Sequence, residues 1–342
     1  MKVDDIHLVG IGTAKCGTVQ TADAVADGRY AAEERDRSGQ LAISVAGTTP
    51  APDLAIEAAN VALAECGHGA DEIGAHFHAD VHPQGPDGWS APHYINRMTI
   101  NQPVMSVEIR NGCIGFLSSL QLASCYLMAM PSRPAVLLTC ADNFGTPSVD
   151  RWRASSLFVL ADGGGSVVLS RRPGFARLLS IGSVSAPELE EQHRMGETLF
   201  PPGLTVGGSL NLTERSSLFR QQVAEGILHP TSDFGSVVIE AVEAVLKDAD
   251  ISLDDVARVV HDGFTHWAIR DLFLDPLGIE EEKGILDYTR SHGHGGPLDQ
   301  LRGLEYLWRG GHVGVGDKVL LFAGAPGMEG AAAVVEITAT PS

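Results

Sequence analysis

The sequence predicts a layered α/β protein made of two related halves, and two observations support this prediction. Helix-period and strand-like segments alternate along the chain, which is typical of layered α/β proteins. The chain also resembles itself when it is shifted by 183 positions, from residue 56 to residue 239. Ile-Glu-Ala at 56–58 then falls on Ile-Glu-Ala at 239–241, and Val-Leu-Leu at 136–138 falls on Val-Leu-Leu at 319–321.

In the first half, residues 1–170, the expected elements follow from apolar periodicity and capping. The N-terminal segment MKVDDIHLVGIG predicts a strand and a turn. An aspartate at its start predicts a helix over residues 53–64, and residues 73–80 and 134–140 predict buried strands. Residues 82–106, with several prolines and Trp89, predict a long loop, and such loops usually line sites or interfaces.

The second half, residues 171–342, repeats this order. Residues 236–249 predict a helix, residues 256–260 a strand and residues 317–323 a buried strand. Residues 185–232 form a second irregular stretch, and a glycine-rich turn follows the last buried strand. The chain is long enough for two such domains.

Charge and cysteine content exclude several classes of protein. The formal net charge of −19 disfavours binding to nucleic acid and to anionic membranes. Five cysteines without CxxC spacing indicate neither a disulfide framework nor a zinc knuckle. We expect no signal peptide and no apolar run of about 18 residues, and therefore a cytoplasmic protein without a transmembrane helix.

Cys113 is the first candidate for chemistry. It follows the strand-like run 104–110 and precedes an apolar helix, so we expect it at a helix N-terminus. The partial positive charge there lowers a thiol pKa from about 8.5 and favours the nucleophilic thiolate. A buried structural cysteine is the alternative interpretation. Under the shift Cys113 falls on Gly296, so only one of two similar helix starts carries a thiol.

A histidine and a carboxylate are expected to complete the site. His266 follows a predicted strand, and sites in α/β proteins collect at strand ends, although His261 competes for the same role. Asp299 lies one turn into the second-half helix, where it can orient an imidazole or simply serve as a helix N-terminal charge. His292 and His294 lie just before it and could face the same cavity.

We expect no metal site. His76 and His78 would share one face of a strand, with His82 nearby, but no carboxylate stands at a regular ligand spacing, although Asp80 is near. The Asp-Gly-Gly-Gly turn at 162–165 lacks both phosphate-loop spacings and is interpreted as a structural turn.

These segments resemble the thiolase-fold ketoacyl-acyl-carrier-protein synthase III (KAS III) family over nearly the whole chain. The resemblance rests on the Cys113 helix start, the Leu-Ala-Asp-Gly-Gly-Gly turn at 160–165, the His266 loop and the Gly-Asp-Lys-Val-Leu-Leu segment at 316–321. It implies a duplicated five-layered αβαβα fold with pseudo-twofold symmetry. It also implies a homodimer and a tunnel that admits an acyl thioester to the cysteine.

Two departures from the family pattern change the expected reaction. Condensing members use cysteine, histidine and asparagine, but here the asparagine position holds His294, and Phe-Thr-His-Trp-Ala around His266 replaces Pro-His-Gln-Ala-Asn. The sequence looks more like the KAS III-like acyltransferases of antibiotic biosynthesis, which pass an acyl group from a carrier protein or CoA to a small-molecule hydroxyl or amine. The alternative is a decarboxylative condensing enzyme that primes a polyketide or fatty acid. A non-catalytic partner subunit is a third interpretation, against which the retained cysteine argues.

The resemblance implies a role for each candidate residue. It also implies that the reaction requires no metal or redox cofactor. Cys113 would carry the acyl group, and His266, oriented by Asp299, would be the general base. The backbone N–H groups of Cys113 and Gly324 would form the oxyanion hole. Further side chains are expected to contact the substrate or support the catalytic groups: His261, His294, Trp89 and Phe116.

The donor is expected at a short basic segment. Family members hold the CoA nucleotide with an aromatic residue and an arginine near the tunnel mouth, and Arg151, Trp152 and Arg153 lie at the matching place. The N-terminal tryptophan stretch of housekeeping members is not matched, which favours an acyl carrier protein as donor. Carrier proteins are acidic, so docking on this acidic chain needs a local basic patch.

Overall fold

The computed structural model describes residues 1–130, 132–325 and 328–341. Nine strands form one mixed sheet in the order β5-β4-β6-β7-β1-β8-β11-β10-β9, and two more form a separate ribbon. The first-half strands are β1 (His7–Thr13), β4 (Ile73–Ala79), β5 (Met105–Ile109), β6 (Ala135–Asp142) and β7 (Gly163–Ser170). The second-half strands are β8 (Ala176–Ser185), β9 (Val256–Val260), β10 (Lys318–Ala325) and β11 (Glu329–Ile337).

The two halves use the same strand order, as the internal repeat predicted. The order β4-β6-β7-β1 in the first half matches β9-β10-β11-β8 in the second, and in each set only the first pair is parallel. The half-sheets join where β1 pairs with β8 over two residue pairs. The domain division at residues 170 and 171, which remains a proposal, falls between β7 and β8.

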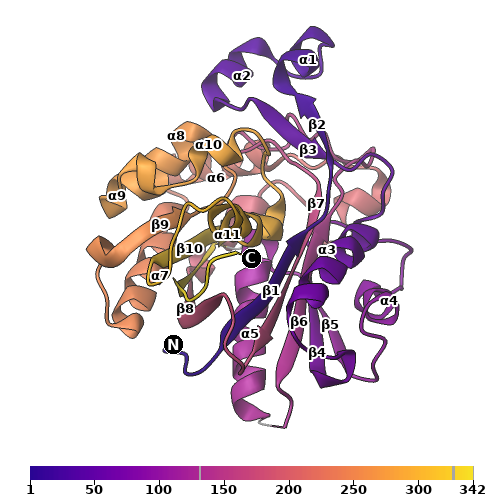
Figure 1. The fold of residues 1–342 in the computed structure, drawn as a ribbon. Helices are drawn as coiled ribbons and strands as arrows, with labels where there is room; N and C mark the ends of the chain where they lie inside the picture. The colour runs from indigo at the N-terminus through magenta and orange to yellow at the C-terminus, as the bar shows by residue number, and fades with distance from the viewer. Residues whose placement is uncertain (131, 326–327, 342) are drawn as a thin grey trace.

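Helices form three layers around the half-sheets (Figure 1). α3 (Ala51–Glu65) covers β1, β6 and β7, and α7 (Phe234–Ala249) covers β8, β10 and β11. α5 (Gly115–Ala129) and α11 (Asp299–Arg309) contact each other and strands of both halves, so they form the central layer. This order of layers is the αβαβα architecture that the resemblance implied.

Small residues allow the outer helix α3 to lie close to the sheet. A Cβ at Gly10 of β1 would lie 2.1 Å from the carbonyl oxygen of Ala62, so a larger residue at position 10 would force the helix away. The opposite helix α7 begins at a capping box in which Asp233 accepts from the N–H of Ser236.

The central helix is more apolar than the sequence analysis expected. Residues Gly112–Ala129 are long and apolar enough to cross a membrane, with a mean hydropathy of 1.4. Because this segment packs between the half-sheets and is 56% buried there, its apolar composition is that of a core helix. The expectation that the chain contains no such run was therefore wrong.

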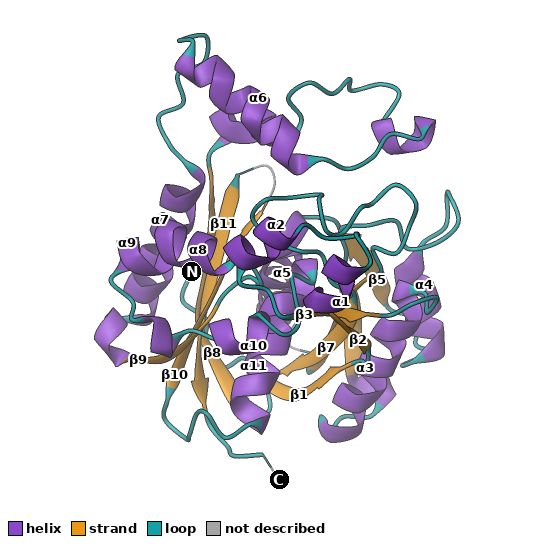
Figure 2. Ribbon diagram, turned by 90° about the horizontal axis from the view of Figure 1, so that it is seen from above, coloured by secondary structure: helices purple, strands orange, loops and turns teal. Residues whose placement is uncertain are grey.

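Two segments of the chain lie outside the layered core. β2 (Gly17–Gln20), β3 (Ala42–Val45), α1 (Thr21–Ala26) and α2 (Ala32–Ser38) lie at the top of Figure 1. The segment between β8 and α7 carries α6 (Leu212–Ala224) and stands apart from the sheets in Figure 2. This segment and the predicted loop 82–106, which holds α4 (Ala91–Met98), are thus more ordered than expected. Three short helices complete the second half: α8 (His266–Ile269), α9 (Asp275–Leu277) and α10 (Leu286–Thr289).

Candidate active site

Cys113 lies in a tight turn directly before α5. Gly112 has a φ of 56°, which favours glycine, and the Cys113 side chain is buried. A Cβ at Gly115 would lie 3.2 Å from the Cβ of Ala79 and 3.3 Å from the Cβ of Pro297. Since Pro297 belongs to the turn before α11, the two equivalent helix starts touch, as the repeat predicted.

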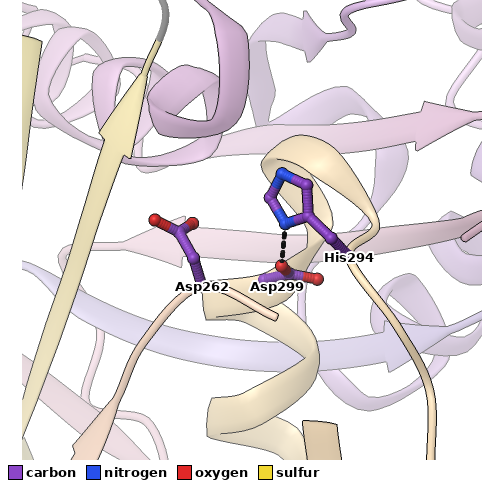
Figure 3. Close-up of side chains that lie close together, drawn as sticks. All are labelled: Asp262, His294 and Asp299. Carbon is purple, nitrogen blue, oxygen red and sulfur yellow. Dashed lines mark hydrogen bonds and ion pairs between the residues drawn. The ribbon is translucent and has the colours of Figure 1, made fainter. Parts of the chain in front are cut away.

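His294 connects Cys113 to Asp299 through hydrogen bonds. Its Nε2 lies 3.0 Å from the Sγ of Cys113, and its Nδ1 donates to Oδ2 of Asp299 at 2.6 Å (Figure 3). All three side chains are buried. A nucleophile, a base and a carboxylate that orients the base therefore form one continuous chain, with His294 in the central position.

His266 does not reach this chain, and the structure corrects its assignment. It is the first residue of α8, its side chain is 42% exposed, and its Nε2 pairs with Glu281 at 3.0 Å. The loop after β9 passes the site at Asp262 and has turned away when it reaches His266. Choosing a histidine from the loop after this strand therefore selected the wrong residue.

His261 also has a position outside the triad. Its Nδ1 donates to the carbonyl oxygen of Asp262 at 2.8 Å, and its Nε2 accepts from the N–H of Ile285 at 3.2 Å. Burial lowers the pKa of His261 to about 4, so the ring stays neutral at pH 7. Both ring nitrogens of His261 are thus used to hold the loop after β9 in place.

Four donors hold the carboxylate of Asp299. Oδ2 accepts from His294 and from the N–H of Gly263 at 2.6 Å, and Oδ1 accepts from the N–H of Gly295 at 2.9 Å and from Arg302 at 2.5 Å. A Cβ at Gly263 would lie 3.0 Å from Oδ2, so glycine permits this approach. Burial opposes ionisation, but the charges of His294 and Arg302 prevail and lower the pKa of Asp299 to about 2.

The first half of the chain fixes the backbone of His294. Its N–H donates to Val159 at 2.9 Å, its carbonyl accepts from Ala161 at 2.8 Å, and it forms a parallel bridge with Leu160. The rings of Phe158 and Phe264 lie 4.5 and 5.1 Å from the imidazole. His294 thus belongs to the second half of the chain, whereas the residues that hold its backbone and ring come from both halves.

The pKa shifts of Cys113 and His294 act in opposite directions on proton transfer from thiol to imidazole. Burial raises the pKa of Cys113, although His294 opposes this effect, so the expected lowering at the helix start is wrong. Burial alone would lower the pKa of His294, but Cys113 and Asp299 raise it well above its usual value. An imidazolium formed here is therefore stabilised by Asp299.

A second carboxylate, Asp262, lies beside His294 (Figure 3). Acceptor or ligand atoms of Asp262, His294 and Asp299 all lie within 4.8 Å of one another. Both nitrogens of His294 already have partners, so we interpret this cluster as a hydrogen-bonded site rather than a metal centre. The sequence analysis missed Asp262, although the strand-end argument applied to it directly.

The proposed oxyanion hole is only partly supported. The N–H of Gly324 donates to Oδ2 of Asp262 at 2.9 Å, so this N–H is occupied and the assignment of Gly324 needs correction. Pro326 and Gly327 of the same glycine-rich turn lie outside the described residues. The N–H of Cys113, at the start of the catalytic turn, remains a proposed donor.

The predicted donor segment lines a cavity of about 500 Å³ together with Arg29. Arg151 is not a free docking charge, because it forms a salt bridge with the buried Asp162. Trp152 is 7% exposed, and the guanidinium carbon of Arg29 lies over its ring, 5.9 Å from the ring centre. Arg153 is exposed.

A second cavity, of about 450 Å³, lies between the α6 segment and the body of the protein. Apolar residues dominate its lining, and Trp267 contributes a buried indole N–H with no partner among the described residues. Phe234 separates this cavity from the site, because its ring packs against Gly324. We call this space the α6 cavity.

Two other predicted residues lie elsewhere. Trp89 is 42% exposed and lies beside Tyr94, with ring centres 5.7 Å apart. Phe116 is fully buried in the main core cluster, where it supports α5.

Comparisons with known proteins agree with this architecture. Residues 107–185 match the family 3-oxoacyl-[acyl-carrier-protein] synthase III, and residues 246–337 match its C-terminal domain. The solved structure of ChlB3, described as an acyltransferase, is 36% identical and has a TM-score of 0.91, covering 98% of this chain and 99% of that chain.

More distant relatives extend over the same length. The 3-oxoacyl-[acyl-carrier-protein] synthase III of Aquifex aeolicus is 21% identical with a TM-score of 0.78, over 97% of this chain and 99% of that one. The β-ketoacyl-[acyl-carrier-protein] synthase III of Clostridium beijerinckii is 22% identical over 98% of this chain and 100% of that protein. The chain therefore belongs to the 3-oxoacyl-[acyl-carrier-protein] synthase III family and has the thiolase fold.

Proposed function

We propose that the protein is an acyltransferase that moves an acyl group from a thioester to a hydroxyl or amine of a small molecule. One observation carries the proposal: the hydrogen-bonded chain Cys113–His294–Asp299, with histidine where condensing relatives have asparagine. The likeness to ChlB3 over nearly the full length of both chains supports it.

The first half-reaction loads the cysteine. The Sγ of Cys113 attacks the thioester carbonyl while its proton moves to Nε2 of His294, 3.0 Å away. The negative charge of Asp299 stabilises the imidazolium, and the departing thiolate of the donor takes a proton from the imidazolium or from solution. The product is an acyl group bonded to Cys113.

The second half-reaction transfers the acyl group. The acceptor oxygen or nitrogen attacks the acyl-enzyme, its proton passes to a basic side chain of the site, and the thiolate of Cys113 is released. No step needs a metal or redox cofactor, so the proposal includes none.

The residue at position 294 supports acyl transfer over decarboxylative condensation. Decarboxylation of malonate forms an enolate, which hydrogen-bond donors at its oxygen would stabilise. Here the position that supplies an asparagine donor in condensing relatives holds His294, whose ring is already engaged by Cys113 and Asp299. Condensation therefore remains the alternative, to be tested directly.

The two cavities suggest where the substrates bind. We assign the donor, an acyl carrier protein or acyl-CoA, to the cavity at Trp152 and Arg153, and the acceptor to the α6 cavity. Phe234, which lines the α6 cavity, and Phe264, which packs against His294, lie between this cavity and the catalytic residues, so the acceptor would reach Cys113 past these two rings. We further propose that the protein is cytoplasmic, which is consistent with its five free cysteines. We also propose that it forms a homodimer and acts in antibiotic or polyketide biosynthesis.

Intact-mass measurement after incubation with a panel of acyl thioesters, including malonyl-CoA, tests the proposal. We expect the mass of an intact acyl group on the wild-type protein and none on Cys113→Ala. If acetyl loading followed by malonyl carrier protein gave CO2 and a β-keto product, the protein would be a condensing enzyme.

A further inference from the structure

We propose that Asp262 is a second catalytic residue, which binds the acceptor hydroxyl and takes its proton in the second half-reaction. The inference rests on the proposed acyltransferase function and adds a base that is distinct from His294. It concerns the only one of the three clustered side chains in Figure 3 that the triad does not use.

The position of Asp262 fits this role. It is the second residue after β9 (Val256–Val260), and its side chain is fully buried, with an oxygen within 4.8 Å of a ring nitrogen of His294. Oδ1 accepts from Nε2 of Gln300 at 2.9 Å, and Oδ2 accepts from the N–H of Gly324. Each oxygen retains a further lone pair, because a carboxylate oxygen can accept two hydrogen bonds.

Among the described residues, Asp262 has no cationic hydrogen-bond partner that would hold it ionised, so its carboxylate can accept a proton. Asp299 is paired with Arg302 at 2.5 Å and is thereby held ionised. The partners of Asp262 are a neutral amide and a backbone N–H. Burial accordingly raises the pKa of Asp262 to about 7, although His294 opposes this, and a base with that pKa works well near neutral pH.

The state of His294 explains why a second base is useful. Burial lowers the pKa of His294, and Cys113 and Asp299 raise it; after acylation only Asp299, hydrogen-bonded at 2.6 Å, continues to favour a protonated ring. A protonated ring cannot accept another proton, but it can stabilise the thiolate that leaves when the C–S bond breaks. His294 would then serve the leaving sulfur while Asp262 serves the attacking oxygen.

The step balances. The acceptor O–H proton moves to Asp262 as the new C–O bond forms, and the C–S bond breaks with its electron pair on Sγ of Cys113. The thiolate stays paired with the imidazolium, and protonated Asp262 releases its proton to solution. In this route the donor thiolate takes its proton from solution during loading, so the overall reaction consumes no net proton.

The variant Asp262→Asn suits a test because the site can accommodate the amide. Oε1 of Gln300 has no hydrogen-bond partner among the described residues. If the Gln300 amide rotates, it loses its 3.3 Å bond to the carbonyl oxygen of Phe322, but Oε1 can then accept from the new Asn Nδ2 while Asn Oδ1 still accepts from Gly324. The shape of the site is kept and the base is lost.

Two probe nucleophiles separate a base from a structural role. Acyl-enzyme is prepared with the acetyl- or malonyl-CoA that loads, and its decay is followed by intact mass in ethanol or in hydroxylamine. Ethanol must lose a proton as it attacks, whereas hydroxylamine is a strong nucleophile without base assistance. For Asp262→Asn we expect loading within about threefold of wild type, ethanolysis slower by about 100-fold, and hydroxylaminolysis within about threefold.

An equal loss with both nucleophiles would mean a structural role and overturn the inference, as would no loss with ethanol. Asp142→Asn is the matched control, because Asp142 is another buried carboxylate that accepts from backbone N–H groups, those of Val81 and His82. We expect it to leave the ratio of the two decay rates unchanged.

The pH dependence of the wild-type protein tests the same inference if the variant does not fold. Ethanolysis of the acyl-enzyme should rise with pH through an inflection near 7, and a rate that stays flat from pH 5.5 to 9 would overturn the inference. Absence of any acyl group on Cys113 would instead refute the proposed function on which the inference rests.

Discussion

Replacing Asp299 by asparagine should inactivate the protein by inverting the hydrogen-bonding roles of His294. Oδ2 of Asp299 accepts from two donors, Nδ1 of His294 and the N–H of Gly263, and Oδ1 accepts from two more. An amide has only one accepting atom, so one pair of donors must face an NH2 group. If that pair includes His294, the ring has to accept at Nδ1, which places the proton on Nε2. Nε2 can then no longer receive the thiol proton of Cys113.

The structure gives the size of the expected loss. The pKa of Asp299 falls from 3.8 to about 2, which corresponds to roughly 2.5 kcal/mol in favour of the ionised form, at about 1.4 kcal/mol per pKa unit. This energy corresponds to about 60-fold and is shared between His294 and Arg302, so only part of it bears on a step that forms imidazolium. The wrong tautomer adds to it, so we expect the rate of loading to fall by about 10³–10⁴-fold.

The assay is the rate of acyl-enzyme formation by quenched-flow intact mass, with circular dichroism as a check on folding. Asp142→Asn serves as the control for loss of a buried carboxylate. A loss of less than about tenfold in a folded Asp299→Asn protein would refute the reasoning, because His294 would then not depend on Asp299 for its tautomer.

The remaining predictions concern the corrected histidine, the α6 cavity and a buried charge. His266→Ala should leave both half-reactions within about twofold of wild type, whereas His294→Ala should abolish loading, both measured by intact mass. Val223→Trp, which fills the α6 cavity, should raise the KM for the natural acceptor at least tenfold without changing the loading rate; unchanged KM would contradict the assignment of this cavity. Burial and then Glu108 raise the pKa of Asp80 to about 7, so ionised Asp80 destabilises the folded state as pH rises from about 4 to 7. Asp80→Asn should therefore raise the Tm by more at pH 8 than at pH 5, and an equal change at both would contradict this.

The fold was predictable from the sequence because its signals are local and occur twice. The strand β6 reappears 183 residues later with the bounds of β10, and the alanine-rich helix α3 reappears as α7. The cysteine was predictable as well, since its turn before α5 has a cysteine-free counterpart in Gly296. Asp299 was found by the same shift, from its place one turn into the equivalent helix.

The histidine could not be chosen by the same means. The ring that reaches Cys113 is decided by contacts between the halves, because the backbone of His294 is held by residues 159–161 of the first half. The strand-end rule pointed to the correct loop, but it does not say how soon the chain turns away. Asp262 stays at the site, whereas His266, four residues later, begins a surface helix.

The duplication itself explains why one site can perform two half-reactions. Each half presents a helix start to the centre, and the close contact at Gly115 and Pro297 keeps the two within reach of one acyl group. The first half supplies only the thiol, which holds the acyl group. The second half supplies the groups that move protons: His294 before its helix, Asp299 within it, and Asp262 from the loop after β9. If Asp262 serves the acceptor and His294 serves the sulfur, the two proton transfers are separated in space, and the pair can be altered one at a time by Asp262→Asn and Asp299→Asn.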